Sequence, residues 1–328
     1  MNKKQIKFDW PDIGQEKAQS FLEKSINSGK IAQTYIFLGL SDLGKNTMAL
    51  AFARNLLLSD KNFKGDLKGV NSDLHILKKE EDKKLISIEQ TRDFIRQLGL
   101  SSFLNSYKIA IIKEADLLSN EAKSALLKTL EEPKEKVIII LLLRDLNEMP
   151  ETIISRAQVL RFYPVSSDFI YKKLMKKENI SSSLAKSLAN LSLGRPLKAE
   201  KLKDDPSVYE EEMKRARLFL DFFSLDLAFR RQSLEDYLKT DTKERDLAIE
   251  LLNTWEVLWR DLILIKINRA DLVLYFDLKA DMQNLFSEND EDFFAHLLKL
   301  RYYFKAAHEQ IEANVNPKNA LLNLIYNI

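Results

Sequence analysis

Residues 39–47 have the types and spacing of a phosphate-binding loop. The pattern Gly-x-x-x-x-Gly-Lys places Gly39, Gly44 and Lys45 where backbone N–H groups wrap a phosphate and an amine reaches its outer oxygens. The hydroxyl residue that should follow the lysine and hold magnesium is replaced by Asn46, and Thr47 stands one position late. The sequence therefore predicts a degenerate nucleotide-binding site made of these five residues.

A second segment that could do chemistry follows a predicted strand. In P-loop ATPases a strand ends in an Asp-Glu pair, whose aspartate helps to hold magnesium and whose glutamate polarises the attacking water. Here that pair reads Lys113-Glu114. One interpretation is a degenerate Walker B motif that keeps only its glutamate. The alternative is an ordinary charged strand end.

The elements around these residues alternate between strand and helix up to about residue 165. Strands are predicted over 35–38, 74–77, 108–112 and 137–143, and helices over 13–28, 48–58, 87–98 and 119–132. Such alternation predicts a parallel sheet sandwiched by helices. After Pro164 the pattern is helical, with three short helices over 166–203 and a last helix that starts at Asn316-Pro317.

Composition narrows the classes of protein that are possible. The chain has 328 residues, 45% of them hydrophobic, which suits two or three globular domains. Only 8 glycines and 7 prolines occur, which favours long helices, and the absence of cysteine excludes disulfides and thiolate metal sites. No run approaches transmembrane length, so we expect a cytoplasmic protein. The 51 basic and 49 acidic residues balance, which argues against dedicated high-affinity nucleic-acid binding.

Four further segments resemble one family. The stretch 125–133, ALLKTLEEP, is similar to the L-L-K-x-L-E-E-P segment of bacterial clamp-loader subunits, and 152–158 resembles their S-R-C segment with Ala157 in place of the cysteine. The segments 10–17 and 314–321 are similar to the opening and closing segments of delta-prime subunits. The chain therefore resembles the AAA+ clamp-loader subunits of bacterial DNA polymerase III, over nearly its whole length.

The resemblance implies an architecture and a role for one arginine. It implies an AAA+ α/β domain over 1–165, a three-helix lid domain over 166–205 and an all-helical collar domain for oligomerisation over 206–328. Arg156, within the S-R-C-like segment, would be an arginine finger that acts in trans on the nucleotide of a neighbouring subunit, which supplies roughly 10³–10⁵ in rate. The alternative for Arg156 is an exposed turn arginine.

Departures from the family pattern carry information too. Many relatives have a four-cysteine zinc module where this chain has residues 59–73 without cysteine, so no zinc and no other metal site is expected. Residues 142–145 lack the sensor threonine of the ATPase subunits, and Leu197 replaces a sensor arginine after Gly194. Asn46 is a weak magnesium ligand and the ammonium of Lys113 repels the ion, so we expect no hydrolysis by this chain.

We therefore predict a non-hydrolysing subunit of the delta-prime type, which assembles with clamp-loader ATPase subunits and a delta-like clamp-opening subunit. The complex would load the sliding clamp on primer-template DNA. No cofactor is required, although weak ATP or ADP binding is possible in the degenerate loop. The alternatives are an active AAA+ ATPase of the gamma/tau type, in which Thr47 or a water replaces the lost ligand, and a clamp-loader-like protein outside replication.

Two helices have competing interpretations. Gln90, Thr91 and Arg92 near the start of the helix over 87–98 resemble a template-tracking helix, whose donors suit DNA phosphates, and the alternative is a plain surface helix. Trp255 and Trp259 lie one turn apart, and this spacing favours a core position over a nucleotide-stacking platform.

Overall fold

A computed structural model describes the chain over residues 8–60, 73–80, 83–99, 107–132, 136–176, 180–239, 244–286, 291–313 and 315–328. The chain forms two compact units. The first unit comprises residues 1–170 and 194–198, and the second comprises 171–193 and 199–328. The predicted three-domain division, with boundaries after 165 and 205, stays a prediction.

The first unit contains a sheet of five described strands, all pairs of which are parallel, in the order β2-β3-β4-β1-β5. The strands are β1 (Thr34–Leu38), β2 (Leu74–Leu77), β3 (Lys108–Ile112), β4 (Val137–Leu143) and β5 (Gln158–Arg161). The three central strands β3, β4 and β1 are buried along their whole length, which explains why their Val, Ile and Leu runs were readable in the sequence. The edge strand β5 was not predicted, because Gln158 and Arg161 interrupt its apolar pattern.

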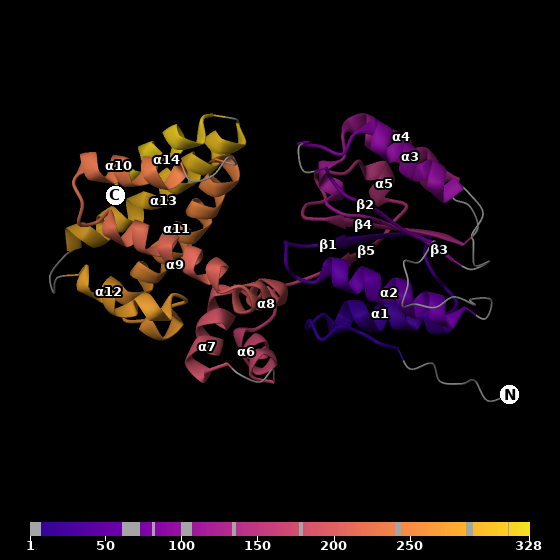
Figure 1. The fold of residues 1–328 in the computed structure, drawn as a ribbon, viewed down its shortest axis with the longest axis horizontal. Helices are drawn as coiled ribbons and strands as arrows, with labels where there is room; N and C mark the ends of the chain where they lie inside the picture. The colour runs from indigo at the N-terminus through magenta and orange to yellow at the C-terminus, as the bar shows by residue number, and fades with distance from the viewer. Residues whose placement is uncertain are drawn as a thin grey trace. The chain divides into compact units, whose positions relative to one another are not determined.

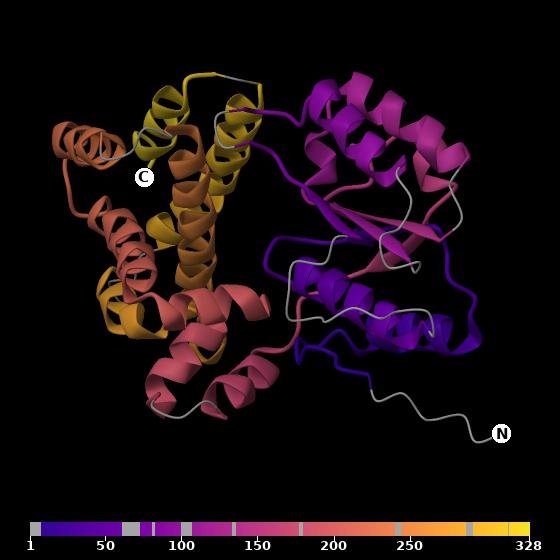
Figure 2. The same ribbon diagram turned by 45° about the vertical axis from the view of Figure 1, so that its right-hand side comes forward.

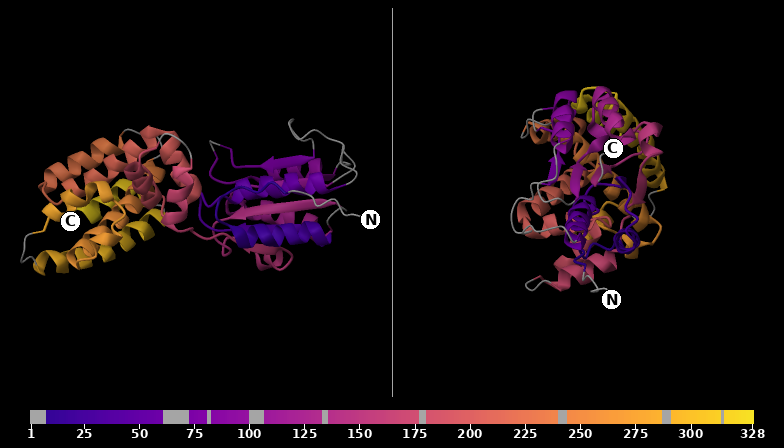
Figure 3. Two further views of the ribbon diagram at one scale, coloured as in Figure 1. Left: turned by 90° about the horizontal axis from the view of Figure 1, so that it is seen from below. Right: turned by 90° about the vertical axis from the view of Figure 1, so that its right-hand side faces the viewer.

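Helices cover both faces of this sheet. They are α1 (Glu16–Ser28), α2 (Lys45–Ser59), α3 (Ile88–Gly99), the 3₁₀ turn η1 (Ala115–Leu117), α4 (Asn120–Glu131) and α5 (Glu151–Ile154). Alternate residues of each strand point to opposite faces, so Tyr35 and Phe37 pack with α1 and α2, while Ile36 and Leu38 pack with α3 and α4. Figure 1 shows the two helical layers with the sheet between them, and Figure 3 shows this unit from two further sides. The predicted α/β sandwich is confirmed.

Local signals fix several helix ends. Ser119 caps α4 by accepting a hydrogen bond from the N–H of Ala122, as predicted. Asn316 caps α14 in the same way, with Pro317 at the first helical position. Pro133, which was predicted to end α4, lies outside the described residues, as do residues 61–72 of the predicted shortened insertion and Asn314 of the closing segment.

The second unit is helical throughout its described residues. The three short helices predicted between 166 and 203 are found as α6 (Ser167–Met175), α7 (Ser182–Leu191) and α8 (Pro196–Asp204), of which α6 and α8 lie partly in the first unit. The others are α9 (Pro206–Asp221), α10 (Leu227–Leu238), α11 (Glu244–Lys266), η2 (Ala270–Leu272), η3 (Phe276–Leu278), α12 (Lys279–Asn284), α13 (Glu291–Glu312) and α14 (Pro317–Ile325). In Figure 2 the long helix α11, in orange, runs through the middle of this unit.

An aromatic cluster and a buried polar network hold the second unit together. Trp255 is fully buried, with its ring 5.8 Å from that of Phe219 and 5.4 Å from that of Phe222, so the core interpretation is confirmed for this residue. Nearby, the guanidinium of Arg215 lies 3.0 Å from the carboxylate of Glu212, and both side chains are buried. This pair lies within α9, and it joins other elements through Glu250 of α11, 3.0 Å from Arg215, and through the hydroxyl of Tyr275, which donates to Glu212 at 2.6 Å. Removing one partner would leave a buried charge uncompensated.

None of the described helices combines the length and the apolar character that crossing a bilayer requires.

Candidate functional site

The loop between β1 and α2 has a backbone that only glycine allows at two positions. Gly39 has φ 149° and Gly44 has φ 91°, both in the region that L side chains avoid. A Cβ on Gly39 would lie 2.6 Å from the carbonyl oxygen of Phe162, and one on Gly44 would lie 2.5 Å from Cδ1 of Ile13. The loop then runs into the N-terminus of α2 at Lys45. This cradle fits a phosphate, because its N–H groups and the helix dipole favour an anion.

The amine of Lys45 lies against the same loop. It donates hydrogen bonds to the carbonyl oxygens of Gly39 and Leu40, the latter at 3.0 Å. Burial lowers the pKa of Lys45 to about 8, while the nearby carboxylate of Asp116 opposes that shift and the guanidinium of Arg144 adds to it. The carboxylate of Asp42 opposes the shift as well, so the crevice at the loop brings together one amine, two carboxylates and one guanidinium.

The groups that would hold magnesium in this crevice do not fit the ion. The amide oxygen of Asn46 is buried without a hydrogen-bond partner among the described residues. It would offer magnesium one uncharged oxygen ligand. Lys113 follows β3 where a carboxylate would be needed, and its ammonium cannot be a ligand. Asp116 contributes a carboxylate three residues later, one of whose oxygens is also buried without a partner. At the two positions that supply them in P-loop ATPases, the hydroxyl and the carboxylate are thus missing, and Asp116 is the carboxylate that this crevice has instead.

Glu114, the residue that would polarise water, is engaged by an arginine. Its backbone is left-handed with φ 50°, a conformation that is strained for a non-glycine residue. Its carboxylate lies 3.6 Å from the guanidinium of Arg144, the residue that follows β4. Because β3 and β4 are neighbours in the sheet, their carboxyl ends bring these two side chains together. Glu114 therefore lies beside a cation, but the two side chains are 43% and 56% exposed, so this pair contributes only about 0–1 kcal/mol and leaves the carboxylate accessible.

A hollow of about 500 Å³ lies at the carboxyl ends of β1, β4 and β5. Gly39, Arg144, Arg161 and Tyr163 are among its lining residues. In open α/β sheets, ligands bind at the carboxyl ends of the strands, at the point where the strand order changes direction. In this sheet that point is at β1. The hollow carries two guanidinium groups and one carboxylate, that of Asp145, so its formal charge is +1.

The start of α8 closes against the P-loop through backbone groups. The N–H of Leu197 donates to the carbonyl oxygen of Asp42 at 3.1 Å. Gly194, at φ 73°, lets the chain approach Val165, whose carbonyl oxygen would lie 2.6 Å from an added Cβ. Leu197 stands where the family's ATPase subunits carry an arginine, so this contact positions the helix without adding a charge to the site.

Arg156 lies away from the P-loop elements, just after α5. Its guanidinium donates to the carbonyl oxygen of Thr152 at 2.9 Å and to the carboxylate of Glu131, at the end of α4, at 3.2 Å. The two side chains of this ion pair remain 40% and 46% exposed. A pair so exposed contributes about 0–1 kcal/mol, so the arginine can exchange Glu131 for another anion at little cost.

The three residues that were predicted to contact DNA differ in their availability. Thr91 is fully buried and its hydroxyl donates to the carbonyl oxygen of Ser87. Gln90 forms a capping box with Ser87, in which each side chain accepts the backbone N–H of the other residue. Arg92 is exposed on the first turns of α3. A DNA contact on this helix stays a prediction. Thr91 is not available for it, Arg92 is exposed, and Gln90 is half-buried with its amide oxygen used in the capping box.

Sequence reasoning missed three residues that the structure brings to these sites. Asp116 is returned toward Lys45 by the turn η1, Arg144 meets Glu114 across neighbouring strand ends, and Glu131 pairs with Arg156. A signal existed for Arg144, because adjacent parallel strands end at the same edge. No periodicity pointed to Asp116 or Glu131.

The fold and the P-loop crevice define the class of this protein. A parallel sheet between helices, with a phosphate loop after β1, an acidic residue after β3 and an all-helical second unit, is an AAA+ architecture. A family described as "DNA polymerase III, delta subunit" matches residues 14–166. The delta' subunit of DNA polymerase III of Bacillus subtilis (strain 168) is 24% identical over 96% of this chain and 97% of its own length. The chain is thus similar to DNA polymerase III subunits, by the family match over residues 14–166 and by the likeness to the delta' subunit over nearly its whole length.

Other relatives match about half of the chain. The gamma/tau subunit of Mycoplasma genitalium is 33% identical over 56% of this chain and 32% of its own length. Among solved structures, a gamma subunit-related protein of Thermotoga maritima is 18% identical over 93% of this chain and 97% of its own, with a TM-score of 0.43.

Proposed function

We propose that this chain is the non-hydrolysing, delta-prime-type subunit of a clamp loader, and that it supplies Arg156 in trans to a neighbour's nucleotide. The observation that carries the proposal is that Asn46 and Lys113 stand at the two positions of the crevice where P-loop ATPases place their magnesium ligands, and neither side chain suits the ion. Arg156, which would serve a neighbour, is present, exposed and held only by a weak surface pair. The likeness to the delta' subunit of Bacillus subtilis over nearly the whole chain supports the same assignment.

The site chemistry divides into two parts. Within the chain, the glycine cradle and Lys45 bind a phosphate weakly, and no cofactor is required, neither ATP nor ADP nor zinc. Between chains, the guanidinium of Arg156 leaves Glu131 and donates to the γ-phosphate oxygens bound by the neighbour. Arginine suits this step because it keeps its charge and presents a rigid fork of donors. The guanidinium of Arg156 would thereby stabilise the negative charge that develops on the phosphoryl group transferred in the neighbouring subunit.

The partners follow from this role. We propose assembly with ATPase subunits of the gamma/tau type and with a delta-like clamp-opening subunit, through the helices beyond residue 206. The sliding clamp and primer-template DNA would be partners of the whole complex, in the cytoplasm. Arg92 on α3 would touch DNA phosphates there. Deleting residues 206–328 should leave an N-terminal part that no longer joins the complex.

ATP turnover by the purified chain, alone and with partner subunits, tests the proposal. We expect negligible turnover by the chain alone. A rate of about one per second or faster, abolished by Lys45→Ala, would favour the second candidate, an active AAA+ ATPase of the gamma/tau type. The observation that favours this second candidate is the intact cradle, in which Gly39, Gly44 and Lys45 keep a phosphate-binding geometry.

A further inference from the structure

The ALLKTLEEP segment, residues 125–133, ends helix α4 with two acidic side chains in succession. Glu131 is the last helical residue, and Glu132 is the C-cap. The carboxyl end of a helix carries partial negative charge, so a carboxylate at that end is unfavourable for the helix itself. The stability of α4 therefore does not account for the charge of Glu131, and its role follows from what it contacts.

Glu131 contacts the guanidinium of Arg156, which follows α5. One terminal nitrogen of the guanidinium donates to a carboxylate oxygen of Glu131 at 3.2 Å, and the other donates to the carbonyl oxygen of Thr152 at 2.9 Å. Among the residues that the structure describes, Glu131 is the one carboxylate that forms an ion pair with Arg156. The two segments that resemble clamp-loader motifs in the sequence are thus joined by a single ion pair.

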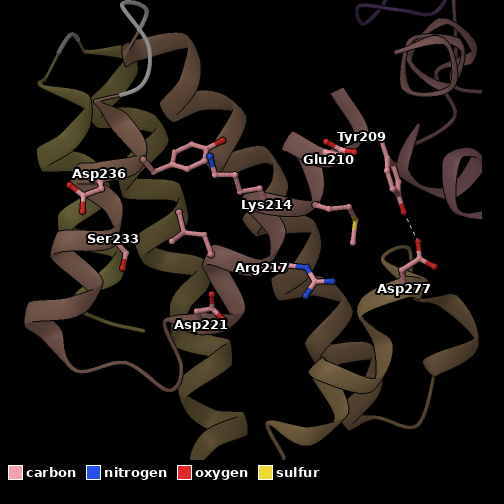
Figure 4. A pocket seen from close by; sticks show the side chains of 11 residues that line it. Tyr209, Glu210, Lys214, Arg217, Asp221, Ser233, Asp236 and Asp277 are labelled. Carbon is pink, nitrogen blue, oxygen red and sulfur yellow. Dashed lines mark hydrogen bonds between the residues drawn. The ribbon is translucent and has the colours of Figure 1, made fainter. Parts of the chain in front are cut away.

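A second exposed arginine shows that nearby acids do not by themselves produce such a pair. Figure 4 shows Arg217 of α9 in a hollow of about 720 Å³ whose lining includes four carboxylates. These belong to Glu210, Asp221, Asp236 and Asp277. Arg217 forms no ion pair with any of them within the described part of the chain. Arg156, in contrast, is held at two points, because α4 and α5 place one acceptor each beside it.

The pair between Glu131 and Arg156 can be broken by a stronger anion. A guanidinium has five N–H donors, and Glu131 and Thr152 each accept from one of them. A phosphate can accept two parallel hydrogen bonds from the fork of an arginine, whereas Glu131 accepts only one here. The terminal phosphate of a neighbour's nucleotide would therefore displace Glu131 once it comes within reach of the guanidinium.

We propose that Glu131 is a positioning residue that holds Arg156 back until a neighbour's terminal phosphate displaces it. While the pair is intact, the guanidinium is withheld from the phosphate, so Glu131 lowers the ATP turnover of the complex before clamp and DNA bind. Because the pair is exposed and weak, it withholds the arginine by at most about fivefold. The inference rests on the proposed function, since it assumes that Arg156 serves a neighbouring subunit.

A charge removal with a matched control tests this role in the reconstituted complex. Glu131→Gln keeps the size of the side chain and removes its charge. Glu132→Gln does the same one residue later, at an exposed glutamate that does not pair with Arg156. ATP turnover is measured with and without clamp and DNA, at equal assembly verified by size-exclusion chromatography. We expect Glu131→Gln to raise the unstimulated turnover about two- to fivefold, so that the stimulation by clamp and DNA falls by a similar factor. Glu132→Gln should change the unstimulated turnover by less than about 1.5-fold.

The combination of Glu131→Gln with Arg156→Ala shows whether Glu131 acts through the arginine. If it does, the combined variant turns over ATP at the rate of Arg156→Ala alone. A rise that persists without Arg156 would overturn the inference, because the charge of Glu131 would then act directly on the neighbour's phosphate. A fall in Glu131→Gln, or equal effects of Glu131→Gln and Glu132→Gln, would also overturn it and leave the proposed function standing. If Arg156→Ala alone left the stimulated turnover unchanged, the proposed function itself would fail.

Discussion

The P-loop crevice and the Arg156 corner of the first unit have kept different parts of the same chemistry. In the crevice the cradle and Lys45 remain, yet Asn46 and Lys113 stand at the magnesium positions. At the other corner Arg156 is exposed and lightly held by Glu131. The residues that would serve the chain's own nucleotide are altered relative to the family pattern, and the one that would serve a neighbour is present. Under the proposed function, the P-loop fold is retained here for its shape while the nucleotide chemistry belongs to a neighbouring subunit.

The largest expected effect tests whether the cradle is retained for shape. Gly44→Ala places a methyl group 2.5 Å from Cδ1 of Ile13 at a residue with φ 91°. The backbone strain alone costs about 1–3 kcal/mol, and the steric contact adds to it. Chemical denaturation should show this loss of unfolding free energy.

Gly29→Ala is the matched control, since Gly29 has φ 68° but nothing within 4 Å of an added Cβ. It should cost only the strain, on the order of 1 kcal/mol. Equal losses for the two variants would mean that the packing of Ile13 on the loop does not hold the cradle.

The second prediction restores the missing ligands. Asn46→Thr combined with Lys113→Asp provides the hydroxyl and the carboxylate that magnesium prefers, and removes a repelling ammonium. Calorimetry should show magnesium–ATP binding at least tenfold tighter than in the wild type, or about 1.4 kcal/mol. No improvement would indicate that the crevice excludes nucleotides by its shape, which the lost ligands do not explain.

The third prediction concerns pH. Burial lowers the pKa of Lys45 from 10.5 to about 8, so between these values the folded chain binds fewer protons than the unfolded chain. The free energy of unfolding therefore rises as the pH increases from about 8 to 10.5. The reason is that the amine loses its charge, and with it the cost of burying that charge. Lys45→Met should gain stability relative to the wild type at pH 7, and the gain should shrink toward pH 10. A difference that stays constant between these pH values would place the titration of Lys45 outside the window.

The smallest effect is expected at the other corner. Glu131→Gln removes the charge that pairs with Arg156, and the unfolding free energy should change by less than about 1 kcal/mol, because both side chains are largely exposed. Glu132→Gln, one residue later, is the control. If Glu131→Gln lowered the unfolding free energy by several kcal/mol, Arg156 would be an arginine that holds the fold together. It would then not be available to a neighbouring subunit.

The sequence predicted those elements whose pattern is local. Runs such as 137–143 are buried on both faces, and caps such as Ser119 act within one turn, so both were readable without a fold. The edge strand β5 was missed, because a half-exposed strand of four residues carries no distinctive period. The P-loop residues were found by spacing, whereas the partners of Glu114 and Arg156 depend on which strands and helices become neighbours. Thr91 shows the converse, since a donor that looked available from its sequence is used within its own helix.

The most direct test of the central claim is the DNA- and clamp-stimulated ATP turnover of the reconstituted complex that contains Arg156→Ala, compared with the wild-type complex. Assembly must be equal, which size-exclusion chromatography of both complexes would verify. A finger supplies roughly 10³–10⁵ in rate at the site it serves, while the complex's other sites remain, so we predict a clear but partial fall in total turnover. Unchanged turnover at equal assembly would contradict the account and leave Arg156 as a surface arginine paired with Glu131.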